Sequence, residues 1–174
     1  MVKAVFRAVM ALTAAMLAAH AQAESPQMIG WVEHVGIQPG GLIMNAKIDT
    51  GADHSSVHAE DVRIADRNGI RMVSFTLRNK QGQSVHLQKP LLRYALIKRR
   101  RNSEPLRRPV VAMDLCVGGS LKRVNVNLAN RENFKYRMLV GRTYLKQGYA
   151  VDPNRRYTVE PACRGQSFAS NSAR

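Results

Sequence analysis

Ala46-Lys47-Ile48-Asp49-Thr50-Gly51-Ala52-Asp53-His54-Ser55-Ser56 joins an apolar strand to an Asp-Thr-Gly turn. Apolar side chains occupy every second position from Leu42 to Ile48, which predicts a β-strand that ends beside Asp49. A loop at a strand end can present a carboxylate to water, and glycine lets neighbouring backbone approach it closely. We therefore predict Asp49, Thr50 and Gly51 as a catalytic turn. The alternative is an ordinary turn after a strand.

The β pattern continues along the chain, with turn residues about every ten positions. Only residues 138–147 look helical, and this segment is short. The pattern predicts an all-β fold, a small barrel or a sandwich, with one short C-terminal helix. We expect strands over residues 29–37, 42–48, 55–64, 73–77, 85–92, 111–117 and 124–128, with hairpin turns at 66–69 and 79–82.

The first 23 residues have the features of a signal peptide. Lys3 and Arg7 form a basic start, residues 8–19 are apolar, and Ala21-Gln22-Ala23 provides a small-residue cleavage site. We predict cleavage near Ala23 and a periplasmic or secreted protein; an uncleaved N-terminal anchor is the alternative. No later stretch approaches the ~20 apolar residues that a membrane span needs, so we expect no stable membrane insertion.

The charge of the chain is strongly basic. Loss of Lys3 and Arg7 with the signal peptide reduces the formal net charge from +15 to +13. Such a charge favours polyanionic partners, among them acidic peptides, although a solvated basic surface is an equally good reading. Export and the scarcity of aromatic residues both argue against nucleic acid as the partner.

Cys116 and Cys163 are the only cysteines. In an oxidising compartment the pair would form a disulfide that ties a central strand to the C-terminal segment. Two free thiols are the alternative. Their separation fits neither a C-x-x-C redox motif nor a zinc knuckle.

A second motif is Met138-Leu139-Val140-Gly141-Arg142-Thr143-Tyr144-Leu145. An early Asp-Thr-Gly-Ala strand followed by a later apolar-apolar-Gly-Arg motif resembles the retropepsin-like aspartic peptidases. The resemblance implies that the apolar residues form a strand behind the active-site loop, where glycine permits a close crossing. It also implies that Asp53 and Arg142 form the ion pair that braces the active-site end of a dimer.

The resemblance extends to a bacterial branch often labelled "ATP-dependent zinc protease" and covers roughly residues 29–160. It implies a single retropepsin-like closed β-barrel domain over residues 24–163, and the Ser/Ala/Asn-rich residues 164–174 are expected to be a disordered tail. Members also occur alongside ATP-grasp ligases, which implies substrates with glutamate-rich or unusual amide bonds. The motifs that carry the resemblance are Gly30-Trp31, Lys47 through Ala59, Arg107-Arg108-Pro109-Val110, Arg137 through Thr143 and Val151-Asp152-Pro153.

The residues do not support the metal or the nucleotide in that label. A zinc peptidase needs His-Glu-x-x-His or an equivalent, whereas His54 and His58 enclose Ser55-Ser56-Val57 and no glutamate. In a strand, residues four apart are separated by ~13 Å. The chain also has no phosphate-binding loop. We therefore predict no metal and no cofactor, and interpret His58 as a structural histidine.

The Asp-Thr-Gly triplet occurs once, whereas aspartic peptidases need two facing carboxylates that share a proton. A two-fold homodimer would bring together two copies of Asp49. The prediction is an exported aspartic endopeptidase that hydrolyses peptide or amide bonds. The alternative is a non-catalytic periplasmic binding or adaptor module on the same barrel, with a basic loop that binds anions.

The spacing between Asp49 and Gly141 requires an insertion. Residues 98–108 are basic and contain Pro105, which indicates an exposed loop. Arg99, Arg100 and Arg101 are candidates for a lip that selects acidic substrates. A solvated loop or a processing site is the alternative, and the hairpin at residues 81–82 is a second candidate for a flap over the active site.

Overall fold

The computed structural model describes residues 25–97, 105–146 and 148–163. The predicted signal peptide, the tail over residues 164–174 and the lip residues Arg99, Arg100 and Arg101 lie outside these ranges and stay predictions. In the described part of the chain, no helix has the length and apolar character that crossing a membrane requires.

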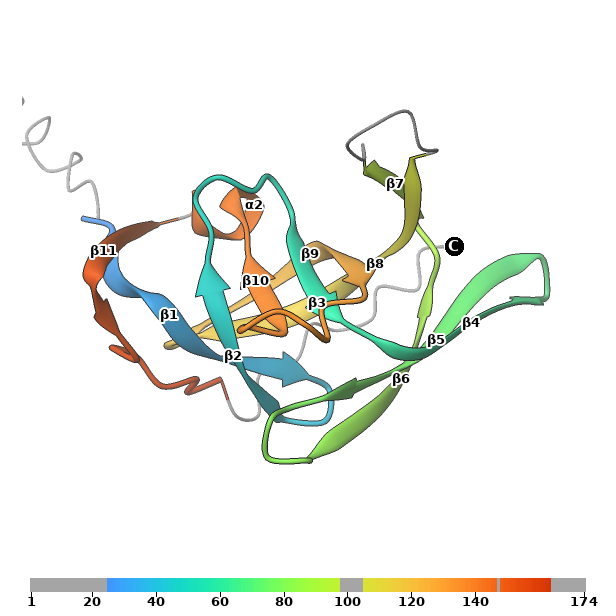
Figure 1. Ribbon diagram of the computed structural model, residues 1–174, viewed down its shortest axis with the longest axis horizontal. Helices are drawn as coiled ribbons and strands as arrows, with labels where there is room; N and C mark the ends of the chain where they lie inside the picture. Colours follow the sequence, from blue (N-terminus) through green and yellow to red (C-terminus); the bar gives the residue numbers. More distant parts are fainter. Residues whose placement is uncertain (1–24, 98–104, 147, 164–174) are drawn as a thin grey trace, which may run out of the picture.

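Six strands close into a barrel (Figure 1), which confirms the predicted all-β fold. A further strand extends the sheet on each side: β11 (Tyr149–Arg156) pairs with β1, and β7 (Arg93–Ile97) pairs with β8. Around the barrel the order is β1 (Gln27–Gln38), β2 (Leu42–Ile48), β10 (Met138–Val140), β3 (Ser55–His58), β9 (Ser120–Ala129) and β8 (Leu106–Val117), and β8 pairs again with β1.

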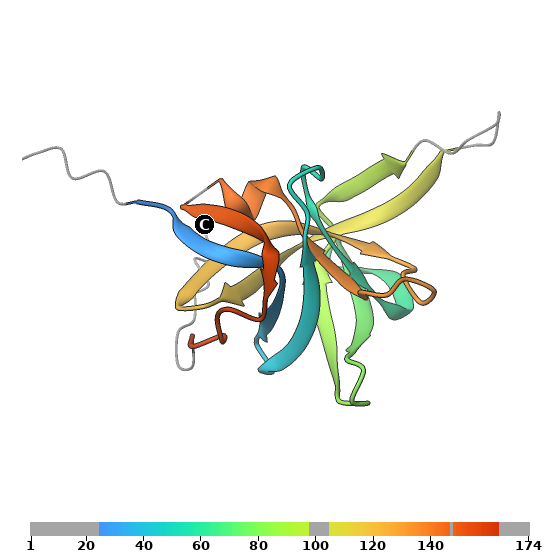
Figure 2. The same cartoon turned by 60° about the vertical axis from the view of Figure 1, so that its left-hand side comes forward.

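The barrel interior is filled by alternate side chains of these strands. In β2, Leu42, Met44, Ala46 and Ile48 are buried, while Lys47 is exposed. A second sheet, formed by β4 (Glu60–Arg67), β5 (Ile70–Arg78) and β6 (Ser84–Pro90), packs against the barrel. It adds Val73, Phe75 and Leu77 of β5 to the same apolar cluster. Figure 2 shows the second sheet extending away from the barrel.

The predicted hairpin turns are present. Asn68 and Gly69 both have left-handed backbone, with φ of 51° and 78°, as a two-residue hairpin turn that follows the strand twist requires. Gly82, with φ of 83°, lies in the turn from β5 to β6.

Two predicted elements were wrong, and two strands were not expected. The strand expected over residues 55–64 divides at Ala59 into β3 and β4, which belong to different sheets. Of the described residues in the helix expected over residues 138–147, only α2 (Arg142–Leu145) is helical. Its first three residues form β10 instead, because β2 and β3 supply hydrogen-bonding partners on both sides. Strands β7 and β11 lack a clear apolar alternation and were not expected.

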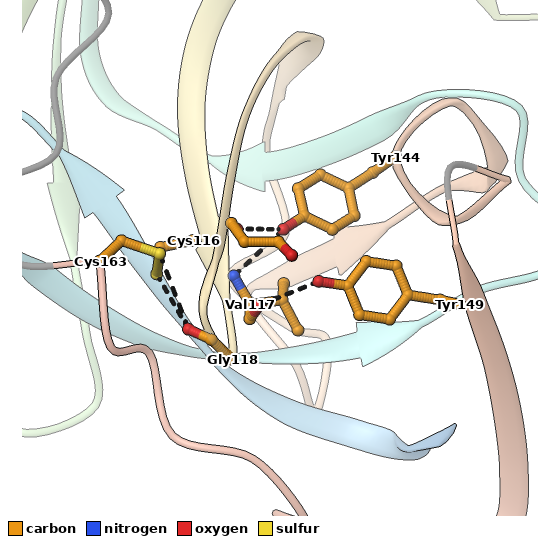
Figure 3. Close-up of a disulfide and its surroundings, with 7 residues drawn as sticks. Cys116, Val117, Gly118, Tyr144, Tyr149 and Cys163 are labelled. Carbon is orange, nitrogen blue, oxygen red and sulfur yellow. Dashed lines mark hydrogen bonds between the residues drawn. A yellow bond between two sulfur atoms is a disulfide. The ribbon is translucent and has the colours of Figure 1, made fainter. Parts of the chain in front are cut away.

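A disulfide joins Cys116 at the end of β8 to Cys163, as Figure 3 shows, and the free-thiol alternative is therefore wrong. Two tyrosines reach the same strand end. The Tyr144 hydroxyl accepts a hydrogen bond from the Val117 N–H at 3.1 Å, and the Tyr149 hydroxyl donates to the Val117 carbonyl at 2.9 Å. These contacts fasten α2, β11 and the C-terminal segment to one end of the barrel.

Glu33 in β1 is fully buried and holds the segment that follows β11. Its carboxylate accepts hydrogen bonds from the N–H groups of Gly30 at 2.6 Å, Thr158 at 2.9 Å and Val159 at 3.2 Å. The Thr158 hydroxyl donates a further bond at 2.6 Å. A buried acidic side chain is tolerated in this position because donors surround both of its oxygens.

We expect Glu33→Gln to lower the free energy of unfolding by about 2 kcal/mol, because the new NH2 group would face N–H donors instead of accepting from them. Urea denaturation measures the change. Glu160→Gln is the matched control, since the Glu160 side chain is 72% exposed, and should change stability by less than about 0.5 kcal/mol. Equal effects of the two substitutions would contradict a structural role for Glu33.

Candidate active site

The loop of residues 49–54 connects β2 to β3 at the upper end of the barrel in Figure 1, beside α2. It begins where β2 pairs with β10, since the Asp49 N–H donates to the Val140 carbonyl at 2.9 Å. The Ala52 N–H then donates to the Asp49 carbonyl at 3.2 Å, which closes the turn. Thr50 and Gly51 are exposed at its tip.

The Asp49 carboxylate remains accessible to water, with 24% of its side chain exposed. One oxygen, Oδ1, accepts a hydrogen bond from the Gly51 N–H at 3.2 Å. The other, Oδ2, lies 3.5 Å from the Lys47 ammonium. The loop therefore orients the carboxylate through its own backbone, and Lys47 compensates its charge.

Gly141 crosses directly behind this loop. A Cβ atom on Gly141 would lie 2.7 Å from the His54 carbonyl carbon and 2.9 Å from the Ala52 carbonyl oxygen, both of them backbone atoms. The Gly141 N–H donates to the Ser55 hydroxyl at 3.2 Å. The implied close crossing of strand and loop is thus present, and only glycine fits there.

The residues after Gly141 hold the loop from the same side. The N–H groups of Arg142 and Thr143 donate to the Ala52 and Asp53 carbonyls at 2.8 and 3.0 Å. The Arg142 guanidinium donates to the Thr50 carbonyl at 2.9 Å and forms an ion pair with the Asp53 carboxylate. Because this pair is exposed, we attribute to it a role in loop geometry more than in stability.

Four side chains in register form a row across the strands next to Asp49: Lys47, Leu139, Ser56 and Asn127. Along each strand, the neighbours of these residues, such as Ala46, Val57 and Leu128, belong to the buried apolar core. Because successive side chains of a strand point to opposite faces, the row lies on the face away from the core. Ser56 and Asn127 are only 4% and 8% exposed. Ser56 Oγ and Asn127 Oδ1 nevertheless have no hydrogen-bond partner within the described ranges. Such groups in a folded protein require an explanation, and a bound polar ligand is one.

Sequence reasoning missed Ser56 and Asn127 as site residues. Ser56 lies in the segment quoted first, but the sequence pattern of that segment did not show which face of the sheet its side chain occupies. Asn127, like Asn125, alternates with Val124, Val126 and Leu128, so the pattern indicated a polar face but not that Asn127 is buried there.

Basic side chains lie near Asp49. Burial and the neighbouring Arg108 lower the pKa of Arg131, whereas the charge of Asp49 raises it. Arg131 and Lys47 therefore share the electrostatic environment of Asp49, and Arg108 lies next to Arg131. The predicted basic lip was assigned to Arg99, Arg100 and Arg101, which are not described. Lys47 and Arg108 were quoted in the sequence motifs without a role at the site, and Arg131 was not identified.

The two histidines of the rejected zinc motif stand at opposite ends of β3. His58 is buried, and its Nδ1 accepts a hydrogen bond from the Arg131 N–H at 2.9 Å. Burial and the nearby Arg137 lower its pKa, although Glu60 acts in the opposite direction. His58 is therefore a structural residue of the strand. Among the residues that the structure describes, no three His, Cys, Asp or Glu side chains gather as a metal site would require.

The two flap candidates differ in position. The hairpin at residues 81–82 lies near the beginning of β2, far from Asp49, because Asn79 Nδ2 donates to the Ile43 carbonyl at 3.1 Å. The strands β7 and β8, which flank the undescribed residues 98–104, point to the same side of the barrel as the Asp49 loop (Figure 1). The first residue of β7, Arg93, lies 3.2 Å from the His54 ring. The hairpin at residues 81–82 is therefore wrong as the flap.

We expect Gly141→Ala to lower the free energy of unfolding by about 3 kcal/mol, because backbone atoms on the loop cannot yield to a methyl group. Gly119→Ala is the control, since a Cβ there meets nothing within 4 Å. Chemical denaturation of both variants measures the difference. A Gly141→Ala protein as stable as Gly119→Ala would show that the crossing is looser than described.

His58 also predicts a pH dependence. Its pKa is lowered from 6.5, so the unfolded chain binds a proton more readily than the folded protein does. Stability should therefore fall as the pH decreases below about 6.5. The fall should be smaller in His58→Asn, whose side-chain oxygen can replace Nδ1 as acceptor, than in the control His86→Asn. Urea titrations at several pH values measure the slopes, and equal slopes would contradict the assignment.

Comparisons with known proteins agree with this geometry. Residues 28–162 match the RimB-like family, described as "Retropepsin-like aspartic endopeptidase RimB". A crystal structure of a Legionella pneumophila protein of unknown function (DUF785) superposes with a TM-score of 0.68 at 29% identity, and covers 79% of this chain and 100% of that one.

Longer relatives carry a similar segment. The chain is 34% identical over 122 residues to a probable alpha-L-glutamate ligase of Shewanella pealeana and 36% identical over 129 residues to one of Shewanella halifaxensis. These matches cover 67% and 71% of this chain but only 26% of each relative. From its sequence match over nearly the whole described domain, this chain belongs to the RimB-like family of retropepsin-like aspartic endopeptidases.

Proposed function

We propose that this protein is an exported aspartic endopeptidase that acts as a homodimer. One observation carries the proposal: the single Asp-Thr-Gly loop holds the water-accessible Asp49 carboxylate on a retropepsin-like barrel. The exposed loop tip at Thr50 and Gly51 would meet its two-fold copy, and this would set two Asp49 carboxylates around one water.

In the proposed reaction, one carboxylate is ionised and the other is protonated. The ionised group takes a proton from the water as its oxygen attacks the carbonyl carbon of the substrate, and the protonated group donates to the carbonyl oxygen. Collapse of the tetrahedral intermediate breaks the C–N bond, with proton transfer to the leaving amine. The Gly51 N–H and the Arg142 bonds to the loop would keep each carboxylate in position.

Acidic substrates are part of the proposal. Lys47 and Arg131 share the environment of Asp49, Arg108 neighbours Arg131, and the undescribed Arg99–Arg101 segment would add to this positive charge. The relatives that contain a similar segment are named as glutamate ligases, which is consistent with a glutamyl amide as the bond cleaved.

Export is supported by two features. The first 23 residues carry the basic, apolar and small-residue segments of a signal peptide. The Cys116–Cys163 disulfide fits an oxidising compartment.

The first test compares the mature protein with Asp49→Asn on a diverse peptide mixture between about pH 4 and about pH 8, with new termini identified by mass spectrometry. We expect cleavage by the wild type and a loss of at least about 100-fold in Asp49→Asn, with the fold unchanged by circular dichroism. Equal cleavage by both proteins would contradict the role of Asp49.

Mixing the two proteins tests the dimer. If each active site takes one Asp49 from each subunit, an equal mixture with exchanged subunits retains about one quarter of the wild-type activity. A value of about one half would mean that each chain acts alone. Sedimentation of both proteins at the assay concentration confirms that equal amounts of dimer are compared.

A second candidate function is a non-catalytic binding or adaptor module. It is favoured by the occurrence of a similar segment within longer proteins named as ligases. In that case Asp49→Asn would leave ligand binding intact, whereas neutralising Arg99, Arg100 and Arg101 would remove the binding of an acidic peptide.

A further inference from the structure

A cavity of about 280 Å³ that is widely open to solvent is lined by residues of β9, by the end of the active-site loop and by α2 with the residue that follows it. No carboxylate is among its lining residues, and two of them, Arg123 and Lys146, are basic. Asp114 holds Arg123 from outside the cavity, through bonds of 2.6 and 2.9 Å to the guanidinium. The complete lining is His54, Arg123, Val124, Asn125, Thr143 and Lys146.

Two polar atoms of this lining are buried and lack a hydrogen-bond partner in the described parts of the chain: His54 Nδ1 and Thr143 Oγ1. His54 Nε2 lies 3.2 Å from a guanidinium nitrogen of Arg93. A guanidinium can only donate, so Nε2 accepts and the proton of the neutral ring is on Nδ1. His54 Nδ1 is therefore a donor without an acceptor, and the Thr143 hydroxyl can donate as well.

We propose that this cavity, the His54–Thr143 site, binds a small oxyanion, either a carboxylate or a phosphate group. The Thr143 hydroxyl and His54 Nδ1–H would donate to its oxygens, and the Lys146 ammonium would supply the charge. Buried donors that lack acceptors, in a lining that contains Lys146 and no carboxylate, are matched best by an anionic oxygen ligand.

The position of the site gives the ligand a structural consequence. His54 is the last residue of the active-site loop, and the Thr143 N–H already donates to the Asp53 carbonyl at 3.0 Å. An oxyanion bound to both side chains would add a second connection between this loop and α2. The site is separate from the Asp49 carboxylate, so its occupancy does not depend on the proposed peptidase activity.

The test is an NMR titration of the mature protein with sodium phosphate and, separately, with sodium glutarate. We expect saturable amide shifts centred on His54, Thr143 and Lys146, and the anion that saturates at the lower concentration identifies the preferred group. Thr143→Val preserves shape and charge, and should weaken binding by about 5-fold. Lys146→Gln should weaken it by at least about 10-fold.

Lys80→Gln removes the same charge from an exposed turn and should leave the affinity unchanged. If Thr143→Val does not fold, the anion affinity of Lys146→Gln is compared with that of Lys80→Gln, and this comparison decides the question. The proposal is overturned if neither anion gives saturable shifts at this cavity, if folded Thr143→Val binds as tightly as the wild type, or if Lys80→Gln and Lys146→Gln weaken binding equally.

Discussion

The close backbone contact between Gly141 and the loop of residues 49–54 determines the position of the other site residues. Because Gly141 has no side chain, the chain can pass against the carbonyl groups of Ala52 and His54 and then turn into α2. The N–H groups of Arg142 and Thr143 are thereby brought to the loop carbonyls. The Asp49 carboxylate is oriented by the Gly51 N–H of its own loop, and backbone hydrogen bonds to Val140 and within the turn hold that loop, although its tip is exposed.

The barrel separates two chemical environments across one layer of strands. Its interior is almost wholly apolar, whereas the opposite face beside Asp49 carries Lys47, Ser56 and Asn127. The period of two along each strand produces both environments from one sequence. Buried polar atoms without partners are costly, and the described residues include such atoms both in the row beside Asp49 and in the proposed His54–Thr143 site.

The sequence was most informative where local chemistry dominates. The alternation in β2, the turns at Asn68 and Gly82, and the pairing of an Asp-Thr-Gly segment with a later Gly-Arg motif all predicted features that the structure contains. It was least informative for β7 and β11, whereas the resemblance had already implied the strand β10 behind the loop. Neither β7 nor β11 shows a clear apolar alternation. Hydrogen bonds from β1, which is distant in sequence, stabilise β11, and β7 pairs with the next strand, β8. A helical period in residues 138–147 could not reveal that β2 and β3 flank its first three residues.

The sequence by itself determined the all-β class, the Asp-Thr-Gly turn and the resemblance to its family, because these depend on residue types in fixed local order. The tertiary structure decided which polar side chains share the face of Asp49, which hairpin is near it, and that Cys116 reaches Cys163. The physical reason is register. A shift of one residue between paired strands would move Ser56 and Asn127 into the core, and long-range packing alone sets that register.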